Sequence, residues 1–83
     1  MTEYRIDVRV VPRAGILDPQ GNAVAGALGS LGFDGVSDVH VGRLITLRLL
    51  AQSETDARER AEAMCRRLLA NPVTEEFDVR VGS

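Results

Sequence analysis

The sequence predicts a single α+β domain of the ferredoxin-like class, in which a four-stranded antiparallel sheet carries two helices on one face. Three observations predict this class. Four short segments alternate apolar and polar residues with the period of a half-buried strand. Two longer segments repeat apolar residues at helical spacing. The segments follow the order β-α-β-β-α-β without a linker or low-complexity tract, so residues 1–83 are expected to form one domain.

The first predicted strand and the first predicted helix have recognisable boundaries. The strand covers residues 4–10, and Pro12 ends it. Its apolar face consists of Tyr4, Ile6, Val8 and Val10. The helix is predicted from about Pro19 to Leu31, because Asp18 can cap its free N–H groups and a proline suits the first helical position. Its apolar residues are Val24, Ala27, Leu28 and Leu31, and Gly32 is the expected stop.

The second and third strands are predicted at residues 36–41 and 44–50, joined as a hairpin around Gly42. Val39 and Val41 would supply the buried side of the first of these strands. The buried side of the next strand would consist of Ile45, Leu47 and Leu49.

The second helix is predicted to begin at Ser53, which forms a pattern like a capping box with Asp56 three residues later. The apolar stripe of this helix is expected to contain Ala57, Ala61, Met64, Cys65 and Leu68. Asn71 and Pro72 end the helix. A final strand is predicted at residues 77–81, with Phe77, Val79 and Val81 on its buried side.

Composition excludes several classes of protein. The net charge of -2 argues against a protein that binds nucleic acid through bulk positive charge. The hydrophobic content of 45% argues against a disordered chain. No apolar run is long enough for a membrane span, and the first residues do not resemble a secretion signal, so we expect a cytoplasmic protein without membrane contact.

Size and cysteine content together favour a binding partner. A domain of 83 residues buries a small core, and such domains often rely on disulfides, metals or oligomerisation. The chain has one cysteine, Cys65, and one histidine, His40, so neither an intramolecular disulfide nor an ordinary zinc site can form. We therefore expect association with a partner, in the first place with a second copy of the chain.

The first predicted helix differs from the second in its polar side. Residues 19–33 contain no charged side chain, whereas the second helix is densely charged. Gly26 and Gly29 within the helix, with Gly21 in its first turn, together cost roughly 2–3 kcal/mol of helix stability relative to alanine. Three explanations remain open for these glycines. They let the helix lie close to its own sheet, they are tolerated sequence drift without a role, or they form a surface for a partner, because small uncharged residues allow close approach.

No residue pattern in the chain predicts a catalytic site. His40 is expected to point away from the helices, and nothing near it in sequence supplies a nucleophile or an orienting acid, which favours a surface or interface residue. Cys65 lies on an apolar stripe and is expected to be a buried small hydrophobe. Glu75 and Glu76 are adjacent, so they point to opposite sides of a strand and cannot form a paired acid-base site.

Arg13, Asp18, Gln20 and Gly21 form a polar group before and at the start of the first helix. Helix capping by Asp18 and a turn at Gly15 explain part of it. A helix N-terminus beside an arginine could also bind an anion, although the glycine-rich phosphate-binding fingerprints are absent.

Other proteins with this fold class differ from the sequence in their functional residues. RNA-recognition domains need stacking aromatic residues on the central strands, and metal-delivery domains need paired cysteines. An acylphosphatase-like enzyme needs an asparagine on a central strand, which is missing here. A small-molecule-binding regulatory module of the ACT type remains an alternative, because the sequences of such modules are loosely defined.

Three stretches of the chain contain specific motifs. They are residues 8–21, which contain L-D-P-Q-G, residues 26–43, which contain L-G-F-D-G-V, and residues 68–77, L-L-A-N-P-V-T-E-E-F. Together these stretches resemble the PurS family, the small subunit of phosphoribosylformylglycinamidine (FGAM) synthase. The resemblance covers essentially the whole chain.

The resemblance implies a non-catalytic subunit in the fourth step of purine synthesis. In this family an ATP- and Mg-dependent synthetase subunit (PurL) amidates formylglycinamide ribonucleotide (FGAR) with ammonia that a glutaminase subunit (PurQ) releases from glutamine. The small subunit self-associates, as a dimer or a dimer of dimers, and bridges the other two subunits while assisting ammonia transfer. It is expected to bind no cofactor or metal of its own.

Two sets of residues are expected to carry these contacts. The synthetase and glutaminase would bind at the first loop and helix, through Arg13, Asp18, Gln20, Gly21, Gly26 and Gly29. Self-association would use the face of the sheet that the helices leave uncovered, or the strand edges. The residues expected to offer apolar surface there are Leu44, Thr46 and Leu50.

Overall fold

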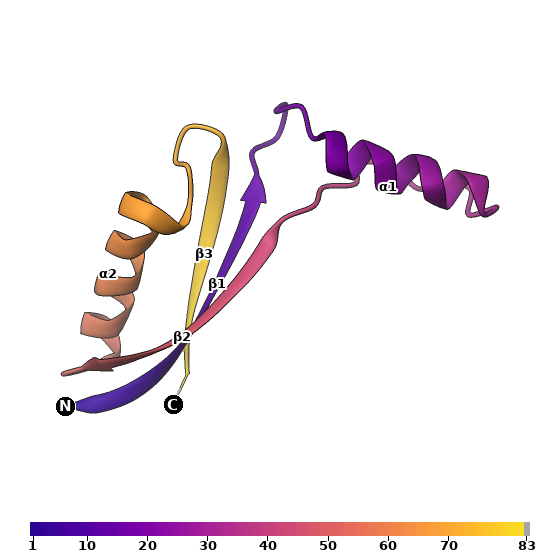
Figure 1. Cartoon of the computed structure of the whole chain (residues 1–83). Coiled ribbons are helices and arrows are strands. Elements are labelled where there is room, and N and C mark those ends of the chain that lie inside the picture. Colours follow the sequence, from indigo (N-terminus) through magenta and orange to yellow (C-terminus); the bar gives the residue numbers. More distant parts are fainter. Residues whose placement is uncertain (83) are drawn as a thin grey trace.

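The computed structural model describes residues 1–82 of the chain. Its elements are β1 (Thr2–Pro12), α1 (Pro19–Ser30), β2 (Arg43–Ala51), α2 (Glu54–Met64), a π-helical turn η1 (Cys65–Leu69) that extends α2, and β3 (Glu75–Gly82). The strands form a three-stranded antiparallel sheet in the order β2-β1-β3, so β2 and β3 are both edge strands (Figure 1). Along residues 1–82, no helix combines the length and apolar character needed to cross a membrane.

The core lies between α2 and one face of the sheet. Its fully buried side chains come largely from the apolar faces of β1 and α2, as the sequence predicts: Ile6, Val8, Val10, Ala57, Ala61 and Cys65. The predicted apolar side chains of the other two strands are partly or fully buried against them: Ile45, Leu47, Leu49, Phe77, Val79 and Val81. Ser53 caps α2 by accepting the Asp56 N–H at 3.0 Å, as predicted. The Asp56 carboxylate accepts the N–H of Gln52 at 3.1 Å, one residue before the N–H of Ser53 that a capping box uses.

The predicted four-stranded sheet is wrong, because residues 36–41 do not form a strand. Gly35 and Asp38 have positive φ values of 83° and 58°, and these left-handed residues interrupt the extended backbone that a strand requires. The N–H of Val41 is bonded to the side chain of Asp18 instead of to a neighbouring strand. The hairpin around Gly42 is therefore absent, and β2 pairs directly with β1.

The prediction that both helices cover one face of the sheet is also wrong. α2 packs against all three strands, whereas α1 projects from one end of the sheet together with the chain that returns to β2 (Figure 1). We call residues 18–42 the arm. The residues predicted to form the buried stripe of α1 are largely accessible, with Val24 41% and Leu31 74% exposed. The helix itself begins at Pro19, with Asp18 as its cap, and ends before Gly32 as predicted.

The predicted buried stripe of α2 is wrong at one residue, Leu68, because the helix ends in a π-helical turn. In a regular α-helix Leu68 would follow Ala61 and Cys65 on the buried side. The Cys65 carbonyl instead accepts the N–H of Ala70, five residues on, at 3.0 Å, which shifts the phase of the last turn. Leu69 and Ala70 consequently pack on the core, and Leu68 is 83% exposed.

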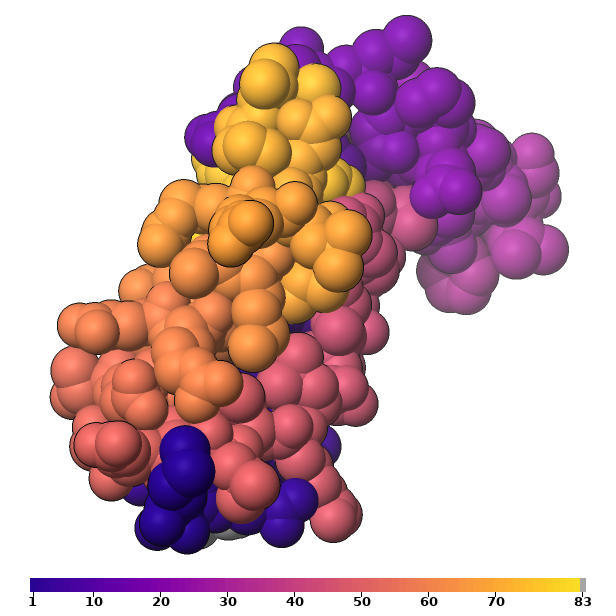
Figure 2. Space-filling view, turned by 60° about the vertical axis from the view of Figure 1, so that its left-hand side comes forward, coloured from indigo at the N-terminus to yellow at the C-terminus, as the bar shows by residue number. Residues whose placement is uncertain are grey.

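The chain is elongated. Its Cα radius of gyration is 16.2 Å, whereas a compact domain of this length has roughly 12 Å. Its accessible surface of 5846 Å² exceeds the roughly 4,900 Å² typical of a compact monomer of this mass. The projecting arm accounts for much of this shape (Figure 2), so a large part of the surface is available for contact with other proteins.

Candidate partner-binding surfaces

Asp18 joins the two ends of the arm. One carboxylate oxygen accepts the N–H of Gly21 at 3.0 Å, and the other accepts the N–H of Val41 at 2.9 Å. These two N–H donors hold the pKa of Asp18 below its ordinary value, because they stabilise the charged carboxylate. Capping of α1 was predicted from the sequence, but the bond to Val41 was not, since 23 residues separate the two positions.

The three glycines of α1 have different environments. Gly21 is buried, and a Cβ atom on it would overlap the carbonyl oxygen of Val39, so a glycine is required for the returning chain to lie against the first turn of α1. A Cβ atom on Gly26 or Gly29 would meet no other atom within 4 Å. The first of the three sequence-based explanations, close packing on the chain's own sheet, is therefore wrong for Gly26 and Gly29. For Gly21 it is replaced by packing on Val39.

The helix of the arm, α1, and the residues just after it have an apolar and uncharged surface. Between positions 19 and 33 there is no ionisable side chain. Large apolar side chains are exposed along the helix and at its far end, including Val24, Leu31, Phe33 and Val36. A protruding element with this composition matches the charge-depleted centre of a protein interface better than it matches an ordinary solvated surface.

His40 lies at the base of the arm, between two carboxylates. Its Nε2 atom is 2.9 Å from Asp38 Oδ1, and its Nδ1 atom is 3.6 Å from Asp18 Oδ2. The ring therefore does not point from a strand onto an open sheet face, as the sequence-based placement assumed. The contacts with Asp18 and Asp38 hold His40 against the base of the arm. Neither contact involves a nucleophile.

Arg13 is directed to a different part of the molecule from the other predicted partner-binding residues. Its guanidinium donates two bonds to the carbonyl of Pro72, at 2.9 and 3.2 Å, and lies 3.7 Å from the Glu76 carboxylate. It thus ties the end of β1 to the turn before β3. Gln20 is exposed beside the buried Gly21 on the first turn of α1. The structure therefore groups Asp18, Gln20 and Gly21, and separates the contacts of Arg13 from theirs.

The sheet face opposite α2 forms a second exposed surface, which we call the uncovered face. Leu44, Thr46 and Leu50 lie on it as predicted, and Leu44 and Leu50 are 62% and 57% exposed. Charged side chains of both signs surround these three residues. Two ion pairs lie among them, Arg5–Asp7 at 3.3 Å and Arg80–Asp78 at 3.5 Å. The charged residues of the uncovered face are Glu3, Arg5, Asp7, Arg9, Arg48, Glu76, Asp78 and Arg80. Equal numbers of the two signs allow such a face to meet a second copy of itself without net repulsion.

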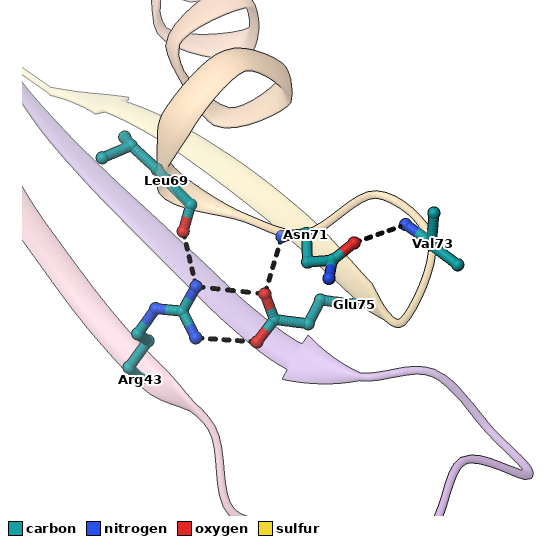
Figure 3. A network of polar contacts seen from close by, with 5 residues as sticks. All are labelled: Arg43, Leu69, Asn71, Val73 and Glu75. Atoms are coloured by element: carbon teal, nitrogen blue, oxygen red, sulfur yellow. Dashed lines mark hydrogen bonds and ion pairs between the residues drawn. The ribbon is translucent and has the colours of Figure 1, made fainter.

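One polar network was missed from the sequence. The Arg43 guanidinium binds both oxygens of Glu75, at 2.7 and 3.1 Å, and donates to the carbonyl of Leu69 at 2.6 Å (Figure 3). Glu75 also accepts the N–H of Asn71 at 2.7 Å. The arginine and this N–H lower the pKa of Glu75. The network joins the start of β2, the end of the helix and the start of β3. Arg43 and Glu75 are 32 residues apart, so no local sequence pattern indicates that they pair.

The described residues offer limited chemistry. Within residues 1–82, no group of three His, Cys, Asp or Glu side chains is placed to hold a metal ion. Cys65 is buried, and burial raises the pKa of its thiol, which keeps the sulfur in its less reactive protonated form. The prominent surfaces are the arm and the uncovered face, and both are suited to binding proteins.

Comparison with known proteins gives consistent results. The family model described as "PurS: Phosphoribosylformylglycinamidine (FGAM) synthase" matches residues 5–83. The PurS subunit of FGAM synthase from Mycobacterium leprae is 45% identical over 75 residues, covering 90% of this chain and 91% of that protein. The corresponding subunit from Synechocystis is 43% identical over 74 residues, covering 89% and 74%. A chain in the structure of PurLQS from Thermotoga maritima superposes with a TM-score of 0.87 at 30% identity, covering 98% of this chain and 99% of that one.

Proposed function

Because the chain belongs to the PurS family of FGAM synthase subunits, we propose that it bridges the synthetase and glutaminase subunits of that enzyme and assists the transfer of ammonia between them. The complex converts FGAR to FGAM with ATP and glutamine in purine biosynthesis. The observation that carries the bridging role is the projecting arm, whose helix α1 has no charged side chain and does not pack on the sheet as α2 does. The similarity to a PurLQS chain supports contact with both other subunits.

The partner contacts are assigned to the arm. Gln20, Gly26 and Gly29 are exposed on α1, and the two glycines leave room for the close approach of another backbone. Asp18 and Gly21 contribute by fixing the position of the helix, since both are engaged with the returning chain. Arg13 contributes at the neighbouring end of the sheet.

Self-association is assigned to the uncovered face. Its residues Leu44, Thr46 and Leu50 lie on the edge strand β2, and its charges are balanced. Two copies joined there would leave both arms accessible, so that a dimer, or a dimer of dimers, could hold a synthetase and a glutaminase at the same time. Confined transfer matters because free ammonia is diluted and protonated in bulk water.

Catalysis belongs to the other subunits in this proposal. ATP and Mg are used by the synthetase, and this chain supplies no catalytic residue and no cofactor site. The complex is assigned to the cytoplasm, as expected from the sequence. The ACT-type alternative gains no support from the three-stranded sheet, which differs from the four-stranded arrangement on which that alternative rested.

Reconstitution tests the proposal. Purified synthetase and glutaminase are mixed with and without this chain, and the formation of a complex is followed by analytical ultracentrifugation together with glutamine-dependent FGAM formation. We expect the complex and the glutamine-dependent rate to require the chain. A mixture that assembles and reacts equally well without it would refute the bridging role.

A further inference from the structure

A pocket that the proposed function does not use lies at the base of the arm. It has a volume of about 590 Å³, which is within the range of roughly 300–1,000 Å³ typical of ligand-binding pockets. One wall is the loop between β1 and α1, and another is the chain that returns from α1 to β2 (Figure 1). The loop contributes apolar side chains, among them Ile16 and Leu17, and the ionisable lining residues are Asp38, His40 and Glu76.

Backbone hydrogen bonds hold the walls of this pocket in place. The N–H of Ile16 donates to the carbonyl of Arg13 at 3.2 Å, and the N–H of Arg13 donates to the carbonyl of Thr74 at 2.9 Å, which together fix the loop. The N–H of Val41 donates to the Asp18 carboxylate at 2.9 Å, which fixes the returning chain. A pocket whose walls are fixed before binding loses little conformational entropy when a partner enters it.

The loop exposes two neighbouring apolar side chains in the pocket. Leu17 is 78% exposed, although the next residue, Asp18, holds the two ends of the arm together. Ile16 is 39% exposed, and neither Ile16 nor Leu17 belongs to the hydrophobic core. A single exposed apolar residue is ordinary, but two neighbours that line one pocket suit the aliphatic part of an incoming side chain.

The charged part of the pocket is acidic. The side chains of Asp38 and Glu76 are 87% and 58% exposed, and no arginine or lysine is among the lining residues. Asp38 contacts His40 at 2.9 Å through one oxygen, and Glu76 lies 3.7 Å from the Arg13 guanidinium, which is too far for a hydrogen bond. Both carboxylates therefore keep the capacity to accept hydrogen bonds from a cation outside the chain.

We propose that this pocket binds an arginine or lysine side chain of a partner protein. The charged end of that side chain is held by Asp38 and Glu76, and its aliphatic stem packs on Ile16 and Leu17. Arginine fits best, because its planar guanidinium can bind a carboxylate through two hydrogen bonds. The proposal rests on the proposed function, since the partner is taken to be the synthetase or the glutaminase, and it adds a basic anchor at the base of the arm to the contacts on α1.

Removal of each negative charge tests the pocket in the reconstituted complex. Asp38→Asn and Glu76→Gln keep the shape of each side chain, and asparagine tolerates the left-handed backbone of residue 38. Each variant is expected to bind the synthetase or the glutaminase about five- to tenfold more weakly, since each loses one half of a charge pair. Asp38 lies outside the uncovered face and is exposed, so Asp38→Asn should leave self-association and the melting temperature nearly unchanged.

Asp34→Asn is the matched control for Asp38→Asn. It removes the same charge from another exposed aspartate of the arm, but Asp34 does not line the pocket. Its affinity for both partners is expected to stay within about twofold of that of the unmodified chain. An equal loss of affinity in Asp34→Asn and Asp38→Asn would show that the overall charge of the arm, and not this pocket, attracts the partner.

Photo-cross-linking identifies the occupant of the pocket. A benzophenone amino acid replaces Leu17 or, as the control, Val73, which is also 78% exposed but does not line the pocket. In the reconstituted complex the probe at position 17, unlike the probe at position 73, should join a segment of the synthetase or glutaminase that contains an arginine or lysine. Replacement of that basic residue by alanine should weaken binding as much as Asp38→Asn does, and the two changes together should cost no more than either alone.

Three results would overturn the proposal. They are normal partner affinity of both Asp38→Asn and Glu76→Gln, an equal loss in Asp34→Asn, and a probe at position 17 that joins a second copy of the chain, a segment without a basic residue, or nothing. The proposed function is tested separately. It fails if the unmodified chain binds neither subunit, whereas the pocket alone is excluded if the unmodified chain binds and the variants bind equally well.

Discussion

At the scale of single residues, Asp18 has the largest influence on the arm. The sequence predicts its role as a helix cap, because an aspartate before a proline is a typical helix start. Its second role depends on the chain returning from residue 36 to residue 42, and no local pattern indicates which N–H will reach the carboxylate. The same limit applies to Arg43 and Glu75, whose partners are distant in sequence.

Replacement of Asp18 tests its role in the arm. Asp18→Ala removes the acceptor for both Gly21 and Val41. We expect the amides of α1 to lose most of their protection from hydrogen exchange, while amides of the sheet keep theirs. Asp38→Ala is the control, because that carboxylate contacts His40 but caps no backbone N–H of α1. Equal protection in the two variants would show that Asp18 does not secure the arm.

The lowered pKa of Asp18 predicts a pH dependence for the arm. A carboxyl group that is more acidic in the ordered arm stabilises it fully above the ordinary pKa of 3.8, and this contribution is lost as the pH falls through the lowered value. Exchange protection of α1 should therefore be constant near neutral pH and decrease in strong acid. Asp18→Ala should abolish that part of the decrease. The same decrease in the variant would contradict the assignment.

At the scale of elements, the sequence predicts where helices and strands lie better than what they pack against. Alternation and helical spacing correctly locate β1, β2, β3 and both helices, because these patterns depend on neighbouring residues. An apolar stripe, however, only indicates that a surface is unsuited to water. In α2 the chain's own sheet covers the stripe, whereas in α1 the corresponding residues remain exposed. The missing fourth strand follows from backbone conformations at Gly35 and Asp38 that alternation cannot show.

Two glycine substitutions in α1 distinguish the effect of packing against residues 36–42 from the effect of helix propensity. Gly21→Ala should destabilise the arm by about 1–3 kcal/mol, because the new methyl group overlaps the Val39 carbonyl. Gly26→Ala should stabilise the helix by up to about 1 kcal/mol, because the site has free space and alanine is the better helix former. Hydrogen exchange of the α1 amides measures both changes. A similar effect from the two substitutions would contradict the packing of residues 36–42 against α1.

At the scale of the whole molecule, the elongated shape explains why the sequence favours a partner. A short chain without a disulfide is expected to need a partner, and the structure leaves two surfaces exposed to which a partner could bind, the arm and the uncovered face. The identity of the partners came from motifs such as L-D-P-Q-G, whose residues the structure places at the start of the arm. The shape itself could not be predicted, because the compact ferredoxin-like arrangement satisfies the same local patterns.

Self-association through the uncovered face gives a further prediction. Leu44→Arg together with Leu50→Arg should reduce the sedimentation coefficient of the isolated chain, because the added charge on this face remains unpaired in a dimer. Val73→Arg is the control, since Val73 is 78% exposed but lies on the turn before β3. A dimer that forms equally well in the double variant would place the interface elsewhere.

The most direct test of the account compares two nitrogen sources in the reconstituted enzyme. FGAM formation by synthetase and glutaminase is measured with glutamine, and again with an excess of ammonium salt, in the presence and absence of this chain. A bridging subunit without catalytic residues predicts that omission abolishes most glutamine-dependent product and leaves the ammonia-dependent rate nearly unchanged. Equal loss of both activities, or loss of neither, would contradict it.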